Sequence, residues 1–142
     1  MLAGMAPLPH WPPGTVALLA TGAGAPHVIP VSTALRAGDD RVLLALAHRR
    51  ESLRRLREDP RVALALLAAG DVACTAYGTA RVAADPLPGA GNVVAVELDV
   101  SEIQDHGSSR FVIDDGVRWR WTDADAERGD EVTRAALRAL LG

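Results

Sequence analysis

The strongest constraint on this chain is a strict alternation of side-chain character over residues 72–82. Small or apolar side chains occupy every second position: Val72, Cys74, Ala76, Gly78, Ala80 and Val82. Successive side chains of a strand point to opposite faces of a sheet, so this period of two predicts a long strand. The turn-forming pair Gly70-Asp71 joins it to the apolar run 61–68, which predicts a neighbouring strand.

Further strands are expected where apolar runs lie between turns rich in Gly and Asp. They cover residues 15–21, 27–35, 41–47 and 94–100, with a last hairpin formed by 111–113 and 117–121. The first three of these strands form a meander. The lead-in, residues 1–13, holds four prolines and is expected to be extended.

Two helices complete the expected elements. Residues 49–59 are mostly charged, and their only apolar residues are Leu53 and Leu56, which predicts a short surface helix with one narrow apolar face. The chain turns helical again over 122–142, with Thr122 as the N-cap. One face of this last helix is expected to carry Val132, Ala136, Ala139 and Leu140.

These elements predict a mainly β protein with a single domain, residues 1–142. The expected architecture is a small antiparallel barrel of six to seven strands, with one helix between the third and fourth strands and a C-terminal helix. The runs 41–47 and 61–68 are almost wholly apolar, so both faces of these strands must be covered. Because two short helices offer little material for the outer cover, we expect a second copy of the chain there, in a homodimer.

The composition excludes several classes of site. All 15 basic residues are arginine, which rules out a Schiff base on a protein lysine and a phosphate-loop lysine. The single cysteine, Cys74, allows neither an internal disulfide nor a cysteine-rich zinc cluster. The four histidines lie on separate elements, so no metal site is expected.

Charge and hydropathy also limit the expected partners. A net charge of −3 gives no general attraction to nucleic acid or to a membrane surface. The longest apolar run, residues 62–69, is far shorter than the ~20 residues of a membrane span. The N-terminus lacks the pattern of a secretory signal, so we expect a cytoplasmic protein.

An arginine cluster marks the first helix, where six of the 15 arginines lie between positions 49 and 61. Spacings of four residues pair Glu51 with Arg55 and Arg54 with Glu58, as on a solvated helix face. Arg49 and Arg50 are left over at the helix N-terminus, where free backbone N–H groups already attract anions. They predict a phosphate-binding site, with a merely solvated surface as the alternative.

The segment 26–32 is unusual for a strand because it contains both Pro26 and Pro30. Proline cannot donate to a sheet ladder, so these residues mark an edge or a bulge. One interpretation is a bulged barrel strand. The other is a strand whose free edge and Ser32 hydroxyl face a ligand.

The order of these motifs resembles the flavin-binding split-barrel family, which includes pyridoxamine 5′-phosphate oxidase and the deazaflavin (coenzyme F-420) reductases. The resemblance covers roughly residues 14–121. It is carried mainly by the strand PHVIPVS and by the helix-to-strand passage LRRLREDPRVAL. It implies a Greek-key split barrel, and a homodimer with two cofactor sites at its interface.

The resemblance also implies which residues hold the cofactor. The phosphate would lie near His48, Arg49, Arg50, Ser52 and Arg54. The isoalloxazine would lie along Pro30, Val31 and Ser32, and Trp119 or Trp121 of the partner chain would close the site. The family often has a Ser-Arg-Lys run at the helix start, where this chain reads Arg50-Glu51-Ser52, so an arginine would replace the lysine.

The sequence thus predicts an oxidoreductase that uses FMN, or alternatively deazaflavin, on a small-molecule substrate. The long signature of the true pyridoxamine phosphate oxidases is not visible, so that activity is not expected. The alternative is a non-catalytic module that binds flavin, heme or a protein partner. A third possibility is a dimeric barrel without a ligand, whose sign would be Arg49 and Arg50 both paired with carboxylates of the same chain.

Overall fold

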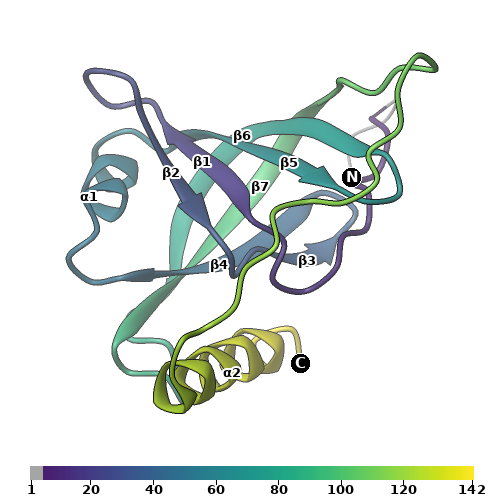
Figure 1. The fold of residues 1–142 in the computed structure, drawn as a ribbon. Helices are drawn as coiled ribbons and strands as arrows, with labels where there is room; N and C mark the ends of the chain where they lie inside the picture. The colour runs from purple at the N-terminus through teal and green to yellow at the C-terminus, as the bar shows by residue number, and fades with distance from the viewer. Residues whose placement is uncertain (1–4) are drawn as a thin grey trace.

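The computed structural model describes residues 5–142 and shows one seven-stranded antiparallel sheet with two helices. The strands are β1 (Ala17–Thr21), β2 (His27–Val31), β3 (Leu35–Gly38), β4 (Arg41–Ala47), β5 (Arg61–Ala68), β6 (Val72–Ala84) and β7 (Val93–Asp105), and the helices are α1 (Glu51–Glu58) and α2 (Ala124–Ala139). The strand order is β2-β1-β5-β6-β7-β4-β3, and the sheet curls into a barrel whose two edge strands do not pair with each other (Figure 1). The predicted mainly-β split barrel is confirmed.

The strand predicted over residues 27–35 is in fact two strands, and the predicted meander is wrong. β2 pairs with β1, whereas β3 pairs with β4 at the opposite edge of the sheet. The chain changes partners at Thr33, whose Oγ1 accepts a hydrogen bond from the Ala45 backbone N–H at 3.0 Å. The Thr33 side chain thus bonds to β4 after the chain has left β2 and before the β3–β4 ladder begins.

The inside of the barrel is filled by aliphatic side chains from all strands except β3. Of the predicted lead-in 1–13, residues 1–4 lie outside the described part of the chain. The remainder is extended and packs against the barrel. Leu8 is buried, and Trp11 Nε1 donates a hydrogen bond to the Ala34 carbonyl at 2.9 Å.

A second, smaller core lies on the outer face of β4 and β7. There α2 packs its Ala136 and Leu137 against Leu43 and Ala95. The outer cover that was expected from a second copy is therefore supplied, for the run 41–47, by the chain's own C-terminal helix. That helix begins after an Asp123 cap, whose side chain accepts from the Ala126 N–H at 2.7 Å, rather than after Thr122.

The predicted hairpin within residues 111–121 is also wrong. Residues 106–123 form no strand and run as an extended segment, here called the strap, over one end of the barrel to α2 (Figure 1). Two side chains fix it: Asp71 accepts from the Ile113 N–H at 2.8 Å, and Trp119 Nε1 donates to the Gly14 carbonyl at 2.9 Å. Extended backbone gives the same alternation as a strand, so the sequence pattern could not separate them.

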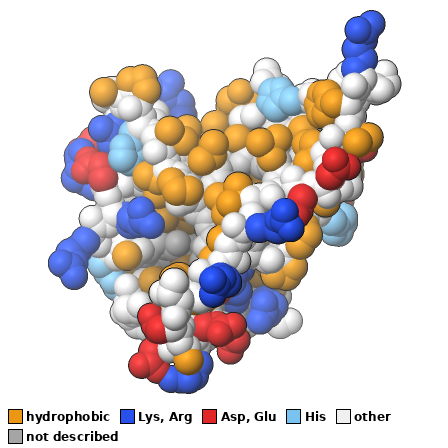
Figure 2. Space-filling view, in the orientation of Figure 1, with side chains coloured by type: hydrophobic (Ala, Val, Ile, Leu, Met, Phe, Trp, Pro, Cys, Tyr) orange, Lys and Arg blue, Asp and Glu red, His pale blue; other side chains and the backbone are white. Residues whose placement is uncertain are grey.

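The outer face of β2, β1, β5 and β6 has no cover within residues 5–142. Leu18, Val28, Leu67 and Tyr77 are 46%, 57%, 58% and 37% exposed there, and we call these four residues the bare face. Figure 2 shows hydrophobic side chains gathered in a band over this part of the sheet. Neither of the two described helices has the length and hydropathy needed to cross a membrane.

Candidate functional site

A cavity of about 420 Å³ lies where the ends of β2 and β4 meet the first half of α2. One wall is the predicted stretch Pro30–Ser32, and the opposite wall is formed by α2 residues Ala126, Gly129, Asp130 and Thr133. Arg50 reaches it from the start of α1, and Trp121 from the strap. Three of the predicted ring-binding residues and one predicted phosphate-binding residue therefore share one space.

The β2 wall presents an open edge to this cavity. Pro30 has no N–H to offer, and the ladder of β2 runs to β1 alone. The hydrogen bond between Thr33 and Ala45 of β4 fixes the chain just after Ser32, and Ser32 lies at the cavity wall. Among residues 5–142, the Ser32 hydroxyl has no hydrogen-bond partner, which leaves it available to a ligand.

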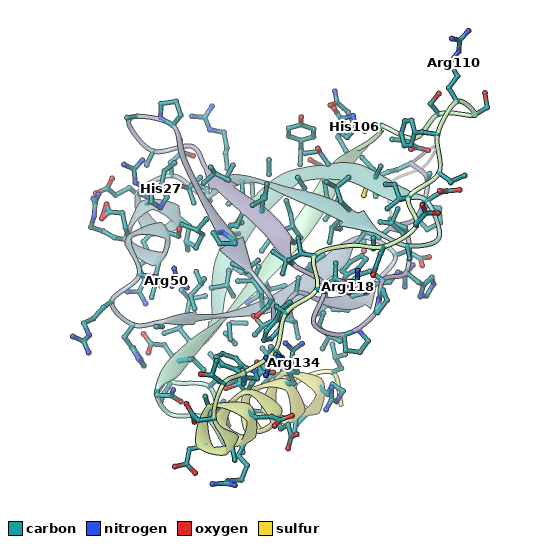
Figure 3. All side chains as sticks on the ribbon, in the orientation of Figure 1. His27, Arg50, His106, Arg110, Arg118 and Arg134 are labelled. Carbon is teal, nitrogen blue, oxygen red and sulfur yellow. The ribbon has the colours of Figure 1, made fainter. Side chains whose placement is uncertain are left out.

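Arg49 and Arg50 stand immediately before the first turn of α1, and Arg50 is its N-cap without a side-chain capping bond. Within residues 5–142, neither guanidinium forms a hydrogen bond or an ion pair. Arg50 lies below α1, at its junction with β4, between the cavity and a second hollow of about 450 Å³ beside His48 and Arg49 (Figure 3). The pairing that would have marked a barrel without a ligand is therefore absent from the described chain.

The later arginines of α1 are engaged. Arg54 pairs with Glu51 and, at 2.5 Å, with Glu58, while Arg55 donates to the carbonyls of the β1–β2 turn. Arg54 was predicted to hold phosphate, yet its charge is already balanced. The hydrogen bond from Arg54 also lowers the pKa of Glu51, so the negative charge at the helix start is neutralised locally.

The two other predicted phosphate ligands, Ser52 and His48, both have polar partners within the chain. Ser52 is fully buried, and its hydroxyl lies 3.1 Å from His27 Nε2. His48 directs both ring nitrogens to oxygen atoms of its own chain, Asp85 and Asn92. Neither of the two lines the 420 Å³ cavity.

The two tryptophans of the strap line different cavities. Their rings meet edge to face with centroids 5.3 Å apart, but Trp121 lines the candidate site. Trp119, the residue predicted for the site, lines a separate cavity of about 460 Å³ with Pro12–Thr15 and the strap. The contribution of α2 to the site was not foreseen. Its trace in the sequence is the helical spacing of the four α2 residues that line the cavity.

The site's chemistry follows from these walls. It combines the Arg50 guanidinium and the Ser32 hydroxyl, both without a partner in the described part of the chain, with an open strand edge and with apolar and aromatic surface. Guanidinium groups bind phosphate oxygens in a fork, and apolar walls accept flat rings. The volume lies within the ~300–1,000 Å³ that small-molecule sites occupy. The residues present therefore fit a planar ligand that carries an anionic group.

No family model matches the sequence, and no curated protein matches it. Solved structures do match its fold. A protein described as a putative pyridoxamine 5′-phosphate oxidase from Lactobacillus delbrueckii is 20% identical, with a TM-score of 0.55 over 64% of this chain and 84% of that one. The chain has a split-barrel fold.

Two further structures share this split barrel. An F420 reductase is 12% identical, with a TM-score of 0.54 over 66% of this chain and 91% of that one. An FAD-binding protein from Mesorhizobium loti is 13% identical, with a TM-score of 0.52 over 63% and 83%. The split barrel is thus a fold that this chain shares with flavin-type and deazaflavin-type proteins.

Proposed function

We propose that this split barrel is an oxidoreductase that binds FMN, or alternatively deazaflavin (coenzyme F-420), and acts on a small-molecule substrate. The observation that carries the proposal is the 420 Å³ cavity, where Arg50 and Ser32 face a common space and neither side chain has a polar partner among residues 5–142. Two of its structural neighbours, an F420 reductase and an FAD-binding protein, support the same class of cofactor.

The chain's own residues would divide the work of binding. Arg50, assisted by Arg49, would neutralise the phosphate and fix its orientation through paired N–H donors. The Ser32 hydroxyl would hydrogen-bond to a polar edge of the ring. Val31, Leu46 and Trp121 would shield the ring from water. The bound ring supplies the hydride chemistry, while the protein supplies binding, orientation and exclusion of water.

The proposal includes a homodimer. The bare face consists of large hydrophobic side chains that are exposed to water, which is unfavourable. Large patches of this kind mark interaction surfaces. It continues from β2, which forms a wall of the cavity, to β6. A second copy on this face would bury both bare faces in one two-fold interface.

Cofactor titration tests this proposal. FMN and deazaflavin are each titrated into purified protein, and fluorescence reports binding. We expect micromolar or tighter binding of one of them, weakened at least about tenfold in Arg50→Ala because a charge-assisted bond is lost. Arg54→Ala is the matched control, since Arg54 is balanced by Glu51 and Glu58, and should bind as the unmodified chain does.

Reduction of the bound cofactor then separates the enzyme from the non-catalytic module. An oxidoreductase should pass electrons from NAD(P)H or reduced deazaflavin through the bound ring at a useful rate. Tight binding without reduction would favour the binding module. If neither FMN nor deazaflavin binds, the proposal fails, and binding of heme would assign the cavity differently.

A further inference from the structure

We propose that His48 is a positioning residue, which holds Arg49 and Arg50 ready for an anionic ligand and does so in its doubly protonated form. The inference rests on the proposed function, because it concerns the same anion site. The predicted role of His48 was direct contact with phosphate. The structure instead engages its ring within the chain, which leaves the direct contact to its two neighbours.

The geometry around the ring is specific. His48 Nε2 lies 3.0 Å from Asp85 Oδ1, and Nδ1 lies 3.2 Å from the Asn92 carbonyl oxygen. A carboxylate and a carbonyl both accept hydrogen bonds, so each ring nitrogen must carry a proton for both bonds to exist together. A neutral imidazole has one N–H and can make only one of them.

Asp85 is the centre of this clamp. Its Oδ2 accepts from Arg57 of the last turn of α1 at 3.0 Å, while its Oδ1 accepts from His48 just before α1. One carboxylate therefore ties both ends of the helix to the loop between β6 and β7. Arg49 and Arg50 lie between these two ties, and the Arg50 N–H bonds to the Ala47 carbonyl at 3.0 Å.

Protonation should then set how well the anion site is ordered. The charged groups around His48 are Asp85, whose Oδ1 it contacts, and those that line the hollow beside it: Arg49, Arg50, Glu51, Arg54, Arg57 and Glu58. Deprotonation leaves one nitrogen lone pair against an acceptor, so one tie opens. Arg49 and Arg50 then lose more conformational entropy on binding a ligand. Because the His48 and Asp85 side chains are 44% and 39% exposed, the effect is modest, about two- to fivefold in affinity.

The test compares cofactor affinity at about pH 5.5 and about pH 8, which brackets the range in which histidine changes charge. Between the lower and the higher pH, the affinity of the intact chain for FMN should fall about two- to fivefold more than the affinity of His48→Gln does. The ligand phosphate itself ionises near pH ~6, but it does so equally with every variant. His106→Gln is the matched control, because His106 contacts Thr75 at the other end of β7 and should keep the unmodified profile.

A second measurement decides the clamp without any ligand. Hydrogen exchange of the backbone amides over residues 48–53 is followed at both pH values. Exchange should be corrected for its intrinsic rate. Protection in the intact chain should then fall as pH rises, whereas in His48→Gln and Asp85→Asn it should be low at both.

The two arms separate the two hypotheses. If FMN and deazaflavin do not bind but protection follows this pattern, the proposed function fails and the clamp stands. If the cofactor binds while His48→Gln keeps the pH profile of the intact chain, His48 does not position the site. Equal protection in the intact chain and both variants would likewise overturn the clamp.

Discussion

The two outer faces of the sheet have similar sequences but different surroundings. On β4 and β7, Leu43 and Ala95 are buried beneath Leu137 of α2. On β1 and β5, Leu18 and Leu67 face outward without cover within residues 5–142. Both faces are lined by aliphatic residues, so the apolarity of a strand shows that a cover is needed but not which segment provides it. The difference arises because the strap places α2 against β4 and β7 and not against β1 and β5.

The charged groups at the margins of the two faces differ in the same way. Beside the covered face, Glu97 is nearly buried and bonded to both Arg41 and Arg81. Beside the bare face, Asp59 and Arg61 form an exposed pair at 2.6 Å, two residues apart in sequence. One face is covered by the chain's own C-terminal helix, and the other has no cover within residues 5–142.

The largest expected effect comes from weakening the packing of α2 on the covered face of β4 and β7. Leu137→Ala deletes a fully buried side chain and should lower the free energy of unfolding by about 2–5 kcal/mol. The matched variant Leu67→Ala removes an exposed side chain of the same size and should cost less than about 1 kcal/mol in dilute protein. Urea unfolding at a fixed low protomer concentration measures both. Equal losses would show that the two faces are buried to the same extent.

The next effect tests the homodimer proposed for the bare face. Leu18→Arg places a charge in the middle of this face and should weaken dimer formation at least about tenfold, because an unpaired charge must be desolvated at the interface. Leu141→Arg, at an equally exposed leucine after α2, is the control and should leave association unchanged. Sedimentation over a range of protein concentrations reports the dissociation constant. A chain that remains monomeric throughout would remove the dimer from the proposal.

The positions of most strands up to residue 105 could be predicted because the signals there are local. These strands have their own period or apolar run, and the Gly-Asp pairs at 38–39 and 70–71 mark two of the turns between strands. The break between β2 and β3 escaped prediction since it depends on the bond from Thr33 to a strand more than ten residues away. The strap was misassigned because alternation reports extended backbone, whether or not a ladder exists.

The candidate site was predictable where charges could be counted along one helix. Pairing arginines with glutamates four residues away leaves Arg49 and Arg50 over at the start of α1, and the structure leaves these two unpaired within residues 5–142. The wall from α2 could not be predicted, because a helix with apolar residues on several sides can dock in more than one rotation. The predicted face included Val132 and Leu140, but both remain exposed while Thr133 and Leu137 are buried.

The smallest effect distinguishes the charge pairs at the two margins by acid titration. Burial alone would raise the pKa of Glu97, but bonds from Arg41 and Arg81 lower it overall, and bonds from Arg61 lower the pKa of Asp59 to about 2. A carboxyl whose pKa is lowered by folding stabilises the fold above its unfolded pKa of about 4 and loses this as the pH falls. Unfolding separates Glu97 from Arg41 and Arg81, which lie far away in sequence, whereas Asp59 and Arg61 remain neighbours in the unfolded chain. The Asp59–Arg61 pair is also screened by water in the folded protein. Glu97→Gln should therefore remove more of the stability lost on acidification below about pH 4.5 than Asp59→Asn does, as urea unfolding at a series of pH values would show. The opposite order would place the stronger electrostatic support at the bare face.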